Sequence, residues 1–174
     1  MTEELDSKIY PIGKAKNLEF TKEVLYHSIL MIESAPVRLR QRITTLNEEE
    51  LELKYREGSW TVRQIVHHLA DSHMNMWIRV KHTLTQENPT IQPYNQNAWA
   101  DSVDYKTASL QDSLFILEGV QNRFSNLIKH MSENDFKRTY VHPEYNKQYT
   151  LGEVVQLYAW HGMHHTAQIE GIFK

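Results

Sequence analysis

Residues 151–173 constrain the fold most, because their histidines occupy positions at which a bundle helix normally buries hydrocarbon. Steps of three and four residues define one stripe with the spacing of an inward helix face. The stripe consists of Leu151, Val154, Tyr158, His161, His165, Gln168 and Ile172. His161 and His165 are four residues apart, so their rings project from one face and can share one metal ion. Satisfied core histidines are the alternative, but a pair at this spacing favours a metal site.

Three further segments have the apolar spacing of long helices. Residues 18–43 fit either one kinked helix or two, because Ser34 and Pro36 form a helix start signal within them. Residues 61–85 and residues 107–131 each fit a single helix. With the last helix, these segments predict an all-α four-helix bundle.

The remaining segments predict the connections of this bundle. Residues 136–149 alternate like extended chain, which predicts a short β-hairpin before the last helix. Residues 86–106 form a connection longer than a simple turn, and such connections usually have a function or are mobile. Residues 1–17 show no periodicity and are expected to form an extended arm on the surface. We expect residues 1–174 to form a single metal-binding domain.

A third histidine can be placed by its helical phase. The second and last long helices begin alike, with Thr61 and Thr150 as the first residues of capping boxes. Counted from these threonines, His68 lies at position +7, and His161 and His165 lie at +11 and +15. Steps of four drift by only about 40° around a helix, so the three rings occupy a similar sector. They can converge if the two helices face each other.

The other histidines need separate interpretations. His67 lies about 100° from His68, which predicts an exposed flank and only a small effect of substitution on stability. His164 leaves the stripe of the last helix. His73 could face the core and serve as a fourth ligand or as a group behind the ligands. Surface or structural positions are expected for His27, His82, His130 and His142.

Composition excludes several classes of function. The net charge of −3 gives no broad positive field, so nucleic acid and anionic membrane surfaces are not expected partners. The absence of cysteine excludes disulfides, thiolate ligands and a cysteine nucleophile. No apolar run approaches the roughly 18 residues of a membrane span, so a cytoplasmic protein is expected. Neither a GxSxG motif nor a Walker loop occurs.

Four segments between about residue 20 and the end have a recognisable pattern: WTVRQIVHHLADSH, NAWAD, VHPE and YAWHGMHHTAQI. Together they resemble the YfiT branch of the DinB/YfiT family of metal-binding helical bundles. The resemblance implies a divalent metal held by three histidines, here His68, His161 and His165. It also implies a metal-dependent hydrolase and a homodimer, while related members use low-molecular-weight thiols such as bacillithiol.

Three imidazoles would leave an open position on a divalent ion, for which zinc is expected and nickel is an alternative. Water at that position supports hydrolysis of a small-molecule substrate, and a thiol held there supports S-transfer. A non-catalytic metal-binding module is the third hypothesis. The catalytic residue is not assigned, because Gly162 stands where an HExxH motif has its glutamate. The carboxylate candidates for a general base are Asp71, Asp101, Glu144 and Glu153.

The long connection has a predicted place as well. Residues 94–101 follow the helix that carries His68, so we expect them to cover the mouth of the metal site and to influence substrate choice. Trp99 could instead plug the end of the core, as large aromatic residues often do.

Overall fold

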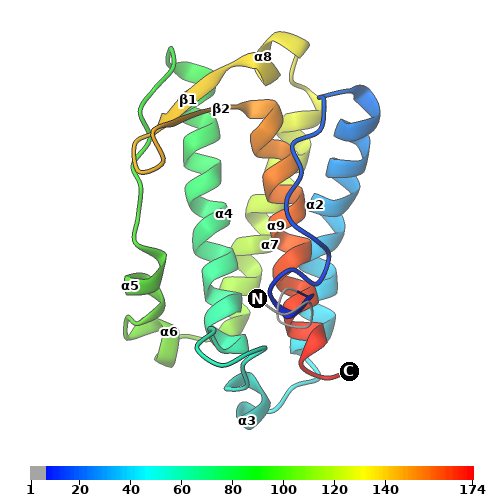
Figure 1. Cartoon of the computed structure of the whole chain (residues 1–174), viewed down its shortest axis with the longest axis vertical. Helices are drawn as coiled ribbons and strands as arrows, with labels where there is room; N and C mark the ends of the chain where they lie inside the picture. The colour runs from blue at the N-terminus through cyan, green and yellow to red at the C-terminus, as the bar shows by residue number, and fades with distance from the viewer. Residues whose placement is uncertain (1–6) are drawn as a thin grey trace.

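Four long helices form the body of the molecule (Figure 1), and the predicted all-α four-helix bundle is confirmed. The computed structural model describes residues 7–174. Helices α2 and α4 each pack against both α7 and α9, so that the four enclose one central seam. The bounds are Lys22–Ile43 for α2, Val62–Thr85 for α4, Leu110–Lys129 for α7 and Leu151–Gly171 for α9.

Shorter elements join the long helices at their ends. They are α3 (Glu48–Leu51), α5 (Gln96–Ala100), α6 (Asp104–Thr107), α8 (Glu133–Lys137), β1 (Thr139–His142) and β2 (Lys147–Thr150). Strands β1 and β2 pair antiparallel and form the expected hairpin, which crosses one end of the bundle (Figure 1). The Val141 amide donates to the carbonyl of Pro89 at 2.9 Å, and the Ile91 amide donates back to Val141 at 3.0 Å. The long connection after α4 is therefore fastened to β1.

Residues 22–43 form one helix, which decides between the two possibilities for this segment. Thr21 caps the helix, so it begins later than the expected position near Leu18. Pro36 lies inside it, and Ser34 donates its hydroxyl to the Met31 carbonyl at 3.2 Å instead of starting a new helix.

The expected arm of residues 1–17 lies partly outside the described residues. In its described part, residues 7–9 are helical rather than extended, and the chain after them runs along α9 (Figure 1). The indole of Trp160 donates to the Gly13 carbonyl at 3.0 Å, and the amide of Gln168 donates to the Ile9 carbonyl at 2.8 Å. Side chains of α9 thus hold this part of the chain in place.

The apolar core consists of two clusters. One contains Ile32, Met76, Val80, Ile91, Phe124, Ile128, Phe136, Tyr140, Leu151, Val154, Val155, Tyr158 and Ala159. The other contains Leu39, Ile43, Leu51, Val62, Ile65, Val66, Leu69, Leu114, Leu117 and Ile169. Between the clusters, the buried residues of α4, α7 and α9 are mostly polar and include Ser72, His73, Gln121, His164, Thr166 and Gln168. A polar layer therefore crosses the middle of the bundle.

No helix within residues 7–174 is long and apolar enough to span a membrane.

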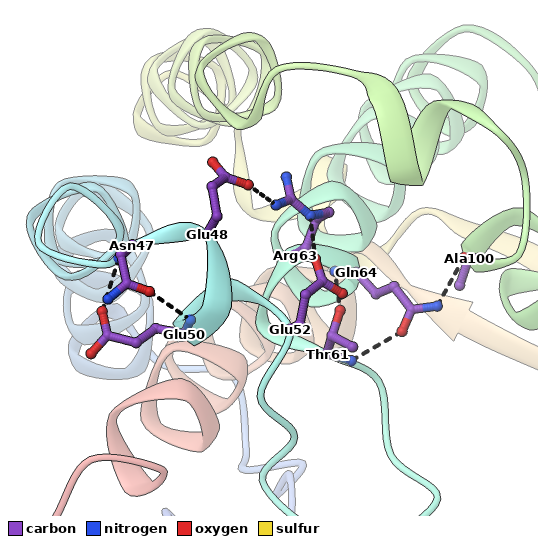
Figure 2. Close-up of polar contacts among 8 residues, drawn as sticks. All are labelled: Asn47, Glu48, Glu50, Glu52, Thr61, Arg63, Gln64 and Ala100. Atoms are coloured by element: carbon purple, nitrogen blue, oxygen red, sulfur yellow. Dashed lines mark hydrogen bonds and ion pairs between the residues drawn. The ribbon is translucent and has the colours of Figure 1, made fainter.

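The start of α4 is tied to two neighbouring elements (Figure 2). Thr61 accepts from the Gln64 amide at 3.2 Å, and the Gln64 side chain accepts from the Thr61 amide at 3.0 Å, which completes the expected capping box. The same Gln64 side chain donates to the Ala100 carbonyl at the end of α5 at 2.9 Å. Arg63 binds Glu52 and Glu48 of the α3 segment. These contacts fix where α4 begins and hence the phase of its histidines.

We expect Thr61→Ala to lower the free energy of unfolding by about 1 kcal/mol, because an N-cap acceptor is lost. Thr85→Ala is the matched control, since Thr85 lies exposed at the other end of α4 and its change should stay within about 0.5 kcal/mol. Urea denaturation of both variants measures the difference. Equal destabilisation would contradict a special role of the capping box.

Candidate metal centre

Three histidines from two helices meet in the polar layer. His68 of α4 and His161 and His165 of α9 each place one ring nitrogen within 4.8 Å of the other two. The Nε2 atoms of His68 and His161 are 3.3 Å apart. Two nitrogens that bind one zinc ion tetrahedrally, each at about 2.0–2.1 Å, are separated by about 3.3 Å. The spacing of this pair therefore fits a shared ion.

Hydrogen bonds behind the cluster orient two of the rings. His165 Nδ1 lies 2.8 Å from Gln168 Oε1, and an Nδ1–H that donates there leaves Nε2 free to bind an ion. His161 Nδ1 lies 3.3 Å from Nε2 of His73, a fully buried residue of α4. His73 thus lies behind His161 and outside the three-histidine group, which fits the second of its two expected roles.

Burial keeps these imidazoles uncharged. It lowers the pKa of His68, His161 and His165 well below the usual 6.5, and neighbouring histidines lower it further. Burial also lowers the pKa of His73, to about 3. A neutral imidazole is the form that binds metal, so the cluster is ready for an ion at neutral pH.

The structure corrects one expectation about the other histidines. His67 points away from the cluster as predicted, but it is only 4% exposed, and its Nδ1 lies 2.7 Å from Ser113 Oγ of α7. The predicted exposed flank is wrong because α7 and Tyr105 of α6 cover it. Of the two positions expected for His142, surface or structural, the structure shows a buried one. His164 lies outside the cluster and stacks on Trp160 with a centroid distance of 4.2 Å. Exposed positions are found, as expected, for His27, His82 and His130.

The absence of an HExxH motif has a packing reason. A Cβ atom added at Gly162 would lie 3.1 Å from Cβ of Ala35 in α2 and 3.8 Å from Cε1 of His73. Helices α2 and α9 approach each other closely here, so a glutamate side chain would have to displace Ala35. Any general base must come from elsewhere in the chain.

A cavity of about 630 Å³ opens beside His161. Of the four carboxylate candidates, Glu144 is the one that lines it. Asp71 accepts from the Tyr105 hydroxyl at 2.6 Å, and Glu153 belongs to the capping box of α9. Asp101 is the exposed C-cap of α5. These three carboxylates therefore have structural positions away from the cavity.

The long connection forms one wall of this cavity. Residues 93–97 line it, opposite tyrosines of the β-hairpin and of α9. Trp99 is 39% exposed and packs on Tyr94 with a centroid distance of 4.4 Å, so it does not plug the core. Sequence reasoning missed Arg79, although it follows Ser72 and Met76 at helical spacing on the inward stripe of α4. This helical spacing was the feature of the sequence that could have identified Arg79 as an inward residue.

Comparisons with known proteins agree with this arrangement. The family model of the DinB superfamily matches residues 31–169. A protein of Bacillus subtilis named "Putative metal-dependent hydrolase YfiT" is 42% identical over 161 residues, which cover 92% of this chain and 90% of that protein. A similarly named protein of Oceanobacillus iheyensis is 42% identical over 166 residues, or 95% of each chain.

Solved structures show the same fold. YfiT of Bacillus subtilis, described as a probable metal-dependent hydrolase with an unusual four-helix bundle topology, matches 95% of both chains with a TM-score of 0.92 and 40% identity. The mycothiol-dependent maleylpyruvate isomerase matches 83% of this chain and 60% of its own, with a TM-score of 0.65 and 14% identity, and so shares the fold alone. By its family match and its relatives, this chain belongs to the DinB superfamily.

Proposed function

We propose that this protein is a metal-dependent hydrolase that binds one divalent ion, zinc or alternatively nickel, through His68, His161 and His165. The observation that carries the proposal is the convergence of three neutral imidazoles, one of which, His161, lines a cavity of about 630 Å³. Structural zinc sites usually have four protein ligands, whereas catalytic sites keep a position for water or substrate. Three ligands beside a substrate-sized cavity therefore favour catalysis.

When bound, such an ion supplies a Lewis acid and lowers the pKa of water to about 7. The chain supplies the groups around the substrate. Glu144 is the carboxylate of the cavity wall that can accept a proton, and burial raises the pKa of Tyr158, which keeps its hydroxyl as a donor. We also propose that the substrate is a small molecule and that the protein forms a homodimer.

His67 and His68 provide a matched pair of substitutions on adjacent residues. His68→Ala should reduce zinc content from about one ion per chain to nearly none, because two imidazoles bind the ion poorly. His67→Ala should retain zinc but lower the free energy of unfolding by about 1–3 kcal/mol, since it leaves the buried Ser113 without its partner. Elemental analysis and urea denaturation measure both effects. Zinc loss in His67→Ala alone would reject the assigned helix face.

The pKa shifts predict how zinc binding depends on pH. A lowered histidine pKa keeps the neutral form down to lower pH, so affinity is lost only as pH falls through the lowered values. Three unperturbed histidines, each half protonated at pH 6.5 and about a tenth protonated at pH 7.5, would weaken binding by about sixfold over this interval. We expect a loss below about threefold between pH 7.5 and 6.5. Calorimetric titration, corrected for buffer protonation, measures it, and a loss of about sixfold would contradict buried neutral ligands.

An activity screen tests the reaction itself. Zinc-loaded protein and His161→Ala would be incubated with a panel of esters and amides, and with the electrophile monochlorobimane, each with and without bacillithiol. We expect hydrolysis that needs zinc and no thiol. Turnover only with bacillithiol would replace the proposal by thiol S-transfer, since the same position can hold a thiolate. No turnover in either arm would support a non-catalytic binding module.

A further inference from the structure

Arg79 is a buried cation without a buried counter-ion. It lies in α4, is 9% exposed and lines the cavity that His161 also lines. Its Nη2 donates to the Gln92 carbonyl at 3.1 Å, while its Nε is buried with no hydrogen-bond partner. No carboxylate within residues 7–174 forms an ion pair with it. Burial of an unpaired charge is costly, and a bound anion would offset the cost of burying Arg79.

The groups around Arg79 suit an anion. Tyr94, Tyr140 and Tyr158 line the same cavity, and burial raises the pKa of each phenol, to about 12 for Tyr94. The hydroxyls therefore stay protonated and can donate hydrogen bonds. Burial lowers the pKa of His142, and the charge of Arg79 lowers it further, so its ring is neutral.

The remaining charge of the cavity lies at its edge. Glu144 lines the cavity but is exposed on the hairpin turn, whereas Arg79, Tyr140 and Tyr158 are buried. The inner wall therefore has one full positive charge surrounded by neutral donors. A carboxylate fits one guanidinium, with which it can form two parallel hydrogen bonds. A phosphate dianion would call for a second cation, which the inner wall lacks.

Arg79 and the three-histidine cluster share one cavity, because His161 lines it together with Arg79. Tyr158 lies between the two, since its ring centroid is 5.7 Å from that of His161 and its side chain forms a hydrogen bond with Arg79. A small molecule can contact both places within a cavity of about 630 Å³.

We propose that Arg79 binds a carboxylate of the substrate, and that the bond to be hydrolysed lies beside His161 in the same cavity. The substrate class is thus a small carboxylic acid that also has an ester or amide bond. The position of the hydrolysed bond rests on the proposed hydrolase function. The carboxylate subsite itself depends only on Arg79 and its neighbours.

Binding of a matched pair of probes tests the subsite. The probes are 4-phenylbutyrate and its uncharged amide 4-phenylbutyramide, titrated into the zinc-loaded protein with calorimetric or NMR detection. The wild type should bind the acid at least about tenfold more tightly than the amide, because only the acid pairs with Arg79. Equal affinities in the wild type would overturn the proposal.

Variants locate the preference. Arg79→Gln should abolish it, and Arg79→Lys should reduce it severalfold, because lysine keeps the charge but loses the planar fork. Arg123→Gln is the control, since it removes the same charge from an exposed position on α7 and should leave the preference intact. A folded Arg79→Gln that retains the preference would overturn the proposal. Failure of both Arg79 variants to fold, judged by circular dichroism, would assign Arg79 to the fold and overturn it as well.

A metal-ligand variant separates the subsite from the ion and from the reaction. His165→Ala removes one histidine of the cluster without changing a residue that lines the cavity. The acid should still be preferred in this variant. Loss of the preference there would mean that the carboxylate binds the ion, which overturns the subsite. Stronger competition by inorganic phosphate than by acetate would overturn the choice of a carboxylate. Absence of hydrolysis with an intact preference would reject the hydrolase alone.

Discussion

The need to bury several imidazoles without charge governs the middle of this bundle. The histidine layer separates the two apolar clusters, and each buried ring must find a partner for its polar atoms. Some do so through Gln168 and through contacts between histidines, but Nδ1 of His68 and of His73 and the amide of Gln121 have no partner. An apolar core would be easier to stabilise than this layer. A bound ion offsets its cost, because metal affinity contributes to folding.

The sequence was sufficient to predict the long helices, apart from whether residues 18–43 form one or two, and the faces of the three histidines. Capping boxes fix where α4 and α9 begin, and a fixed helical period then fixes the phase of every residue after them. Tertiary contacts were the part that periodicity could not supply. His67 became buried because α7 and α6 cover its flank, and His142 because the hairpin folds against the cavity. The phase of a residue gives its direction, but its burial depends on what packs there.

The same distinction applies to the cavity, for which the sequence predicted a contribution from residues 94–101 but none from the hairpin. Residues of α4 and α9 line it as well, and the positions of residues 93–97 and of the hairpin depend on pairing between Val141 and the chain after α4. A charged residue on an inward stripe, such as Arg79, was nevertheless visible in the sequence. The three-histidine cluster thus comes from α4 and α9 alone, whereas much of the cavity wall comes from residues 93–97 and the hairpin. Loop and hairpin changes can alter recognition while the helices preserve the ligands.

The amide of Gln168 joins the start of the chain to the histidine cluster. Its Oε1 lies against His165, and its Nε2 donates to the Ile9 carbonyl. Orientation of the His165 ring and docking of the first described residues therefore use one side chain. Equilibria that share a group are thermodynamically linked, and the linkage acts equally in both directions. Any coupling between occupancy of the cluster and docking of residue 9 on α9 therefore passes through Gln168 and has the same free energy in both directions.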